Sequence, residues 1–203
     1  MSRQPSRRTI VLASASPRRK ELMASLQLEF EVLPSDADES VPSEWSPQQV
    51  VTELAVRKAE AVRQQALERW PDALIIGSDT IVVLDGRIFG KPVNEADSED
   101  MLKTLQGRTH HVYTGIACVD AATGHTRTEY SRTAVHMKSL TPERINAYVR
   151  SGEPADKAGS YAIQGLGSTL VERIEGCYFT VVGLPVPVLS DMLEEFGVSV
   201  LEA

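Results

Sequence analysis

The strongest structural constraint in this sequence is a buried strand that runs directly into a helix start. Residues 9–13 form an apolar and partly β-branched run, which predicts a buried strand. Ser16 then occupies an N-cap position, Pro17 the first helical position, and an apolar stripe begins at Leu22. The pattern predicts that the strand leads into a helix that begins at Pro17.

The first turn of this predicted helix carries two arginines, Arg18 and Arg19. A helix start has unpaired backbone N–H groups and a partial positive charge, so it favours anions and disfavours cations. A bound phosphate would explain the two arginines, because guanidinium groups bind phosphate oxygens well. The alternative is an ordinary surface helix with two solvated arginines, and the segment alone leaves both readings open.

The composition limits the classes of protein that fit. The chain has 203 residues and a formal net charge of −7, which disfavours general binding to nucleic acid polymers or to an anionic membrane. No apolar run approaches the length of a membrane span, and Cys118 and Cys177 are too few for a disulfide scaffold. We therefore expect a soluble, cytoplasmic protein in which residues 1–8 form a short frayed extension.

Local patterns predict strands mixed with helices along the rest of the chain. Helices are expected near residues 46–69, 98–105, 141–151 and 187–196. Strands are expected at 30–33, 73–77 with 81–84, 87–89, 111–119 and 126–138, and a last pair at 170–174 and 179–182. Residues 153–169 are rich in small residues and show no clear helix pattern. The order indicates an α/β fold with a mixed sheet.

Three charged residues are candidates for chemistry. Asp79 interrupts an apolar strand pattern, where aspartate is disfavoured, so it is either a capping residue or a group aimed into a cleft. Lys91 ends the hairpin arm that starts at Asp79, and a tight arm would return it close to that carboxylate. Lys58 lies beside the apolar stripe of the long helix, where its stem would cover apolar surface or its amine would border a cleft.

Two loops and a histidine pair complete the candidates. Glu39 belongs to an acidic loop, which is either simply solvated or a source of oxygen ligands for Mg²⁺. Gln164 lies in a glycine-rich segment, and its amide has both a donor and an acceptor for reading a base edge. His110 and His111 are adjacent, so they face opposite sides of a strand and are expected to be packing or surface residues.

Several short motifs occur in an order and spacing that are together very specific. They are Leu12–Arg19, Gly77–Thr80, Gly90–Pro92, Gly107–His110, Ser151–Pro154 with Asp156–Gly159, Ile163–Gly165 and Val182–Pro185. In these motifs the chain, from Ile10 to about Phe196, resembles the Maf family of house-cleaning nucleoside triphosphate pyrophosphatases.

The resemblance implies hydrolysis of a nucleoside triphosphate to a nucleoside monophosphate and pyrophosphate, with a divalent cation such as Mg²⁺ or Mn²⁺. It also implies one domain over residues 9–203, with a two-lobed mixed α/β fold similar to inosine triphosphate pyrophosphatases and a cleft between the lobes. A homodimer is the expected assembly.

The resemblance also assigns roles to residues. It implies that Asp79 activates water or holds the metal, that Glu39 is a second metal ligand, and that Lys58 and Lys91 line the triphosphate site. The phosphate-binding positions at the helix start match Ser14 and Arg19. The same charges suit phosphoryl transfer, which depends mainly on positioning and on neutralising charge on the phosphate oxygens.

Three further positions distinguish the branches of the family. Arg18, Thr80 and Gln164 match the branch that acts on dTTP and UTP, where a methylated-GTP branch has Trp, Gln and Glu. We therefore expect dTTP and UTP as substrates, with CTP or modified pyrimidine nucleotides as further candidates. The alternatives are a pyrophosphatase for 7-methyl-GTP or another modified nucleotide, and a non-catalytic nucleotide-binding regulator of cell division and septum formation.

Overall fold

The computed structural model describes residues 8–201, and the chain divides into two compact units. The first unit extends to Asp79 and takes in Gly115–Tyr130 and the chain from Gly183 onwards. The second unit comprises Thr80–Thr114 and Ser131–Val182. Two units agree with the two lobes expected from the family resemblance.

The described residues form a seven-stranded sheet with the order β2-β1-β3-β5-β6-β7, in which β4 pairs with β3. β1 is parallel to β2 and β3, whereas β4 is antiparallel to β3 and β7 is antiparallel to β6. The predicted mixed α/β fold is therefore confirmed. The strands are β1 (Ile10–Leu12), β2 (Phe30–Val32), β3 (Leu74–Leu84), β4 (Arg87–Phe89), β5 (Thr109–Asp120), β6 (Thr126–Met137) and β7 (Val171–Glu175).

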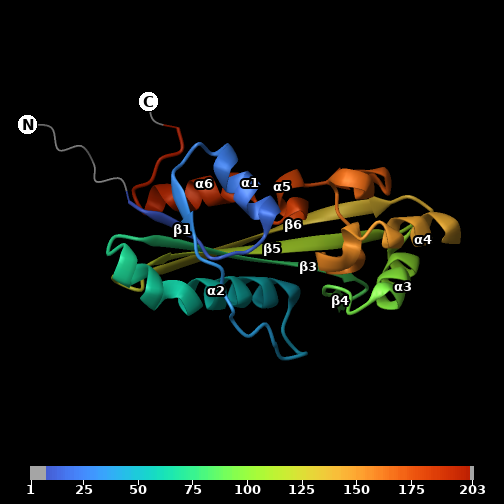
Figure 1. Cartoon of the computed structure of the whole chain (residues 1–203), viewed down its shortest axis with the longest axis horizontal. Coiled ribbons are helices and arrows are strands. Elements are labelled where there is room, and N and C mark those ends of the chain that lie inside the picture. The colour runs from blue at the N-terminus through green and yellow to red at the C-terminus, as the bar shows by residue number, and fades with distance from the viewer. Residues whose placement is uncertain (1–7, 202–203) are drawn as a thin grey trace, which may run out of the picture. The chain divides into compact units, whose positions relative to one another are not determined.

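In the first unit, helix α2 (Pro47–Arg69) covers one side of the strands, and α1 (Pro17–Ser25) and α6 (Val186–Glu195) cover the other (Figure 1). Two of these helices begin where the sequence predicts. Ser16 caps α1, with its side chain accepting the N–H of Arg19, and Ser46 forms a reciprocal capping box at α2. The strand–helix segment at the N-terminal end of the chain is thus confirmed.

Glycines bring α2 unusually close to the sheet. A Cβ atom at Gly77 of β3 would lie 2.0 Å from the carbonyl oxygen of Ala55, and one at Gly115 of β5 would lie 2.2 Å from that of Val51. Only glycine leaves room for the helix backbone at these two positions. The close packing matters for the site, because it determines how far α2 side chains are from β3.

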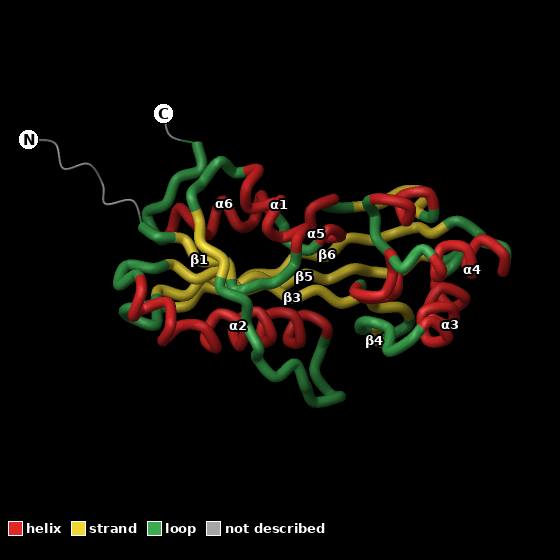
Figure 2. Tube along the Cα trace, in the orientation of Figure 1, coloured by secondary structure: helices red, strands yellow, loops and turns green. Residues whose placement is uncertain are grey.

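The second unit contains three α-helices besides its strands. They are α3 (Glu95–Leu105), α4 (Pro142–Arg150) and α5 (Tyr178–Val182). Three short 3-10 helices, η1 (Glu153–Asp156), η2 (Ala158–Ser160) and η3 (Gly165–Thr169), lie in the segment predicted to lack a clear helix (Figure 2). α3 begins earlier than the predicted residue 98, since Asn94 is its N-cap and accepts the N–H of Asp97.

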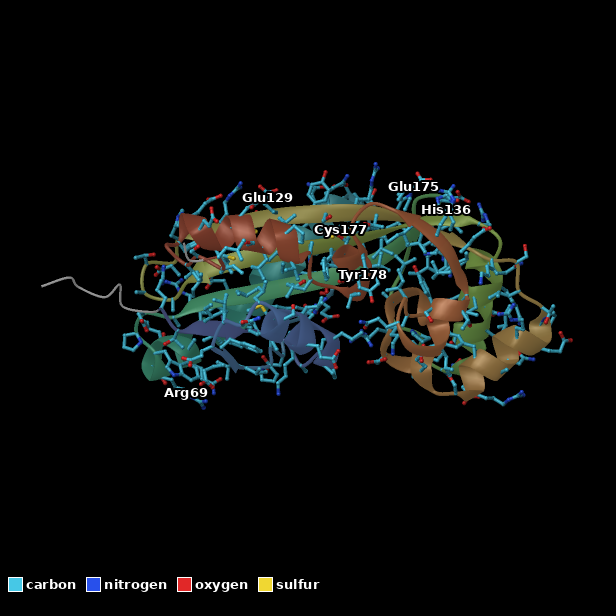
Figure 3. The ribbon with its side chains drawn as sticks, turned by 90° about the horizontal axis from the view of Figure 1, so that it is seen from above. Arg69, Glu129, His136, Glu175, Cys177 and Tyr178 are labelled. Carbon is cyan, nitrogen blue, oxygen red and sulfur yellow. The ribbon has the colours of Figure 1, made fainter. Side chains whose placement is uncertain are left out.

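The strand predicted at residues 179–182 is wrong. β7 pairs with β6 instead, and residues 178–182 form the short helix α5, which begins beside the labelled Cys177 and Tyr178 (Figure 3). Gly176 has a φ of 130° and interrupts the extended chain. The carbonyl of Cys177 then accepts bonds from the Thr133 hydroxyl and the Thr180 N–H, which favours a turn over a second strand.

Arg8 is the one residue of the predicted extension 1–8 within the described part of the chain, and residues 1–7 lie outside it. Its guanidinium is 2.5 Å from the Asp120 carboxylate and also donates to the Asp72 carbonyl.

Both cysteines are free thiols; Cys118 is fully buried, as expected of a small apolar residue, and Cys177 is partly buried. No helix among residues 8–201 is long and apolar enough to cross a membrane.

Candidate active site

Asp79 lies at the point on β3 where the strand leaves the first unit. Side chains two residues apart share one face of a strand, so Asp79 projects on the same side as Gly77, toward α2. The residue is only 6% exposed. A buried carboxylate needs a charged or hydrogen-bonding partner, and the side chain that supplies it comes from α2.

Lys58 of α2 is that partner. Its Nζ is 2.6 Å from Asp79 Oδ1 and 2.8 Å from Glu39 Oε1, so one ammonium contacts two carboxylates. The side chains of Lys58 and Asp79 are largely buried, whereas that of Glu39 is 56% exposed. Three residues that are far apart in the sequence, and that were proposed separately, therefore form one charged cluster in the first unit.

The loop that carries Glu39 is held by the residue next to Lys58. Arg57 donates to the carbonyl oxygen of Ser40 at 2.7 Å and to that of Asp38 at 3.4 Å. Its guanidinium also stacks on the Trp45 ring, 5.5 Å from the centroid. The acidic loop is thus attached to α2, and it is not simply solvated. Arg57 was not predicted as a site residue, because nothing local in the sequence indicates this contact.

The start of α1 forms a second polar cluster in the first unit. Ser14 is only 7% exposed. Its hydroxyl accepts a hydrogen bond from the N–H of Ser16 at 3.2 Å and another from Arg19 Nη1 at 3.4 Å. Arg19 Nε donates to the Gly183 carbonyl at 2.7 Å, and Ser78 Oγ donates to the same oxygen at 3.0 Å. The guanidinium is therefore fixed by the backbone of the Val182–Pro185 motif.

Arg19 is also linked electrostatically to the carboxylates. Burial lowers the pKa of Arg19, the negative charge of Asp79 raises it, the positive charge of Arg18 lowers it, and Glu39 raises it. Because an arginine stays protonated even when its pKa falls somewhat, the group carries a full positive charge at neutral pH. Arg19 is therefore, after Lys58, a second and partly buried cation that interacts electrostatically with Asp79.

The remaining predicted site residues belong to the second unit, apart from the half-buried Arg18 on α1. Thr80 Oγ1 is 2.9 Å from Thr114 Oγ1, which donates to the Thr180 carbonyl at 2.7 Å. Lys91 is exposed, just after β4, and Gln164 is half-buried at the N-cap of η3. The expected approach of Lys91 to Asp79 stays a prediction.

The donor set in the first unit fits a divalent cation. Two carboxylates already share one positive centre, the Lys58 ammonium, and Mg²⁺ typically takes one or two carboxylates together with substrate phosphates. Among residues 8–201 there is no cluster of three or more His, Cys, Asp or Glu side chains arranged to hold a metal by themselves. The residues present therefore suit a metal that is bound jointly with a phosphate-containing substrate.

The adjacent histidines are packing residues, as expected. His110 is fully buried and its Nε2 is 2.6 Å from the Tyr161 hydroxyl, while His111 is partly buried. Burial lowers the pKa of His110 to about 4, so its ring is neutral at pH 7.

With this geometry established, comparison with known proteins assigns the family. The family model described as Maf-like protein matches residues 9–196, so the chain belongs to the Maf family. It is 51% identical over 194 residues to a dTTP/UTP pyrophosphatase of Desulforamulus reducens, covering 96% of this chain and 100% of that protein. It is 47% identical to a dTTP/UTP pyrophosphatase of Bacillus cereus (strain AH820), covering 97% and 100%.

Among solved structures, the Staphylococcus aureus Ham1 protein aligns with a TM-score of 0.49 and 14% identity, over 80% of this chain and 79% of that one. The family model and the relatives at 47–51% identity carry the assignment. The structure also gives physical reasons for two family motifs, since Gly77–Thr80 admits α2 close to Asp79 and Val182–Pro185 binds Arg19.

Proposed function

We propose that this chain hydrolyses dTTP and UTP between the α and β phosphates, giving a nucleoside monophosphate and pyrophosphate. CTP and modified pyrimidine nucleotides are further candidate substrates, and the role would be house-cleaning of the nucleotide pool. The relatives named dTTP/UTP pyrophosphatase, at 47–51% identity over nearly the whole chain, support the substrate class. The agreement of Arg18, Thr80 and Gln164 with that branch supports the base preference.

One observation carries the chemistry: the buried Asp79 carboxylate is held by Lys58 at 2.6 Å, and Arg19 interacts with it electrostatically. A carboxylate that is held in position can accept a proton from a water molecule placed against it. Asp79 would accept the proton of the attacking water. The same two cations, with Lys91, would neutralise the charge that develops on the phosphate oxygens.

The start of α1 would bind the phosphate chain. The Ser14 hydroxyl and the Arg19 guanidinium lie together there, at the end of the helix whose partial charge favours an anion. Arg19 is held by the Gly183 carbonyl, so it would lose little conformational freedom on binding. This accounts for a cation in the first turn of a helix, where helix electrostatics alone disfavour it.

A divalent cation, Mg²⁺ or Mn²⁺, would be held by Glu39 and Asp79 together with the substrate phosphates. When bound, it would polarise the phosphate oxygens and neutralise part of their charge. Arg57 would keep the Glu39 loop close enough for this role.

Base recognition would involve Arg18, Thr80 and Gln164. A glutamine amide has both a donor and an acceptor, which suits the mixed edge of uracil or thymine, whereas a glutamate suits the donor-rich edge of guanine.

We also propose that the protein is a cytoplasmic homodimer. Light scattering coupled to size-exclusion chromatography would test the dimer.

A pyrophosphate-release screen tests the proposed function. Purified protein is assayed with dTTP, UTP, CTP and 7-methyl-GTP, each with Mg²⁺ and with Mn²⁺, and without metal after chelation. Preference for dTTP and UTP with a metal requirement supports the proposal. Preference for 7-methyl-GTP would assign the other branch, and binding of nucleotides without turnover of any of them would favour a regulator over an enzyme.

A further inference from the structure

The segment that carries Gln164 is anchored on both sides. On its N-terminal side, the Tyr148 hydroxyl accepts the N–H of Ala162 at 3.1 Å. On its C-terminal side, the Glu153 carboxylate accepts the N–H of Leu166 at 2.9 Å and that of Gly167 at 2.8 Å. Gln164 therefore lies two residues from an anchored N–H in either direction, all within the second unit.

The two anchoring side chains are coupled to each other, and we call Glu153 and Tyr148 the anchor pair. The Tyr148 hydroxyl donates to Glu153 Oε1 at 2.9 Å while it accepts from Ala162. Ser151 links their backbones, because its hydroxyl donates to the Tyr148 carbonyl at 2.6 Å and accepts the N–H of Glu153 at 3.2 Å. A displacement of either member would therefore disturb the other.

Two glycines let the anchored segment close tightly. Gly165 has a φ of 62°, and a Cβ there would be 2.5 Å from Glu153 Oε2. A Cβ at Gly167 would be 2.2 Å from the Ala162 carbonyl oxygen and 2.6 Å from the Tyr148 hydroxyl. The ends of the segment thus approach each other and the anchor pair more closely than any other residue type permits.

The anchoring carboxylate stays charged at neutral pH. Partial burial raises the pKa of Glu153, but the N–H groups of Gly167 and Leu166, the Tyr148 hydroxyl and the positive charge of Lys157 outweigh burial and lower it below its ordinary value. Hydrogen bonds from backbone N–H groups to an ionised carboxylate are about twice as strong as neutral ones.

A recognition glutamine needs such an anchor for a chemical reason. Uracil and thymine present a carbonyl acceptor beside an N–H donor, whereas cytosine presents an amino donor beside a ring-nitrogen acceptor. A glutamine amide that turned over freely would pair with either edge, since it has both groups. It discriminates only if its backbone and side chain keep one orientation. The Gln164 side chain makes no capping hydrogen bond at the start of η3, so the anchored backbone is what limits the positions that its amide can take.

We propose that Glu153 and Tyr148 are positioning residues that set the preference for uracil and thymine over cytosine by fixing the segment that carries Gln164. This inference rests on the proposed function, because it assigns base recognition to Gln164. Neither residue would touch the substrate, and both would act through the orientation of one amide.

The test compares Glu153→Gln and Tyr148→Phe with Glu172→Gln, a matched control that removes the same charge from an exposed position on β7. Steady-state kcat and KM are measured for UTP, dTTP and CTP. For both anchor variants we expect the ratio of kcat/KM for UTP to that for CTP to fall about tenfold, through a higher KM for UTP with kcat little changed. The control should keep the wild-type ratio.

A double variant separates positioning from a merely structural role. If Glu153 acts through Gln164, then Glu153→Gln should not change the UTP-to-CTP ratio further in a Gln164→Ala background. Hydrogen–deuterium exchange gives an independent readout: Glu153→Gln should speed exchange at Leu166 and Gly167, and Tyr148→Phe at Ala162.

Several outcomes would overturn the inference. They are faster exchange with an unchanged UTP-to-CTP ratio, an equal loss of kcat for all three nucleotides, or a wild-type protein that does not distinguish UTP from CTP. If the wild type hydrolyses no nucleotide, the proposed function fails separately. The anchor is then judged by exchange and by the relative binding of non-hydrolysable UTP and CTP analogues, and equal binding ratios in wild type and variants would reject it. If Glu153→Gln does not fold, Tyr148→Phe carries the same test.

Discussion

The close packing of α2 on β3 makes Gly77→Ala the most informative single substitution. The added Cβ would lie 2.0 Å from the Ala55 carbonyl oxygen and 3.1 Å from the Ala59 nitrogen, both of which are backbone atoms. Real Cβ atoms essentially never approach within 3.0 Å, so the two elements must separate by at least about 1 Å. No flexible side chain is available to absorb the change.

The size of the effect follows from the Lys58–Asp79 contact. That contact is 2.6 Å long, and a separation of about 1 Å takes it past the limit of a hydrogen bond. We expect overpacking to cost about 2 kcal/mol of unfolding free energy, which for a chain of this size lowers Tm by about 4–8 °C. Misplacing a catalytic group by about 1 Å is expected to lower kcat roughly 100-fold.

Thermal denaturation and pyrophosphate release with UTP measure these two effects. Gly90→Ala is the control for stability, because a Cβ at Gly90 has no atom within 4 Å and needs no positive φ. A Gly77→Ala protein with wild-type Tm would refute the packing argument. A lowered Tm with unchanged kcat/KM would refute the claim that α2 positions the catalytic cluster.

Three further predictions concern stability, metal use and specificity. Since the pKa of His110 is about 4 in the native state and about 6.5 when unfolded, the unfolded chain binds more protons between these values. The free energy of unfolding should therefore fall by about 2 kcal/mol from pH 7 to pH 5 in urea melts, and a His110→Gln protein with the same slope would contradict this assignment. Arg57→Ala, which frees the loop of the proposed metal ligand, should raise the Mg²⁺ concentration for half-maximal activity about three- to tenfold, and an unchanged requirement would count against that ligand. The triple variant Arg18→Trp, Thr80→Gln and Gln164→Glu should move substrate preference away from dTTP and UTP, and an unchanged ranking would reject these specificity positions.

Features that depend on neighbouring residues were predictable from the sequence. Ser16 with Pro17 marks the start of α1, and Ser46 with Gln49 makes a capping box at the start of α2. The Asp79 carboxylate was identified because aspartate is disfavoured inside a strand, and the structure shows it buried and ion-paired. The two caps are contacts between residues close in the sequence, and the prediction of Asp79 rests on the low propensity of aspartate for strands.

Features that depend on distant contacts were not predictable. Residues 179–182 have β-branched and aromatic side chains typical of a strand, yet they form a helix. The Thr133 hydroxyl, from another part of the second unit, donates to the Cys177 carbonyl just before that helix. The pairing of Lys58 with Asp79 joins residues 21 positions apart, and the anchoring of Leu166 by Glu153 joins residues 13 apart. Only the packing of the fold creates these contacts, so a pattern read along the chain does not contain them.

The central claim is that Asp79 serves hydrolysis of the bond between the α and β phosphates. The most direct test follows UTP by phosphorus NMR with the wild-type protein and with Asp79→Asn, in the presence of Mg²⁺, after circular dichroism has shown that both are folded. The account predicts UMP and pyrophosphate as the only products of the wild type and no turnover by Asp79→Asn. Release of UDP and orthophosphate, or a wild-type rate in Asp79→Asn, would contradict it.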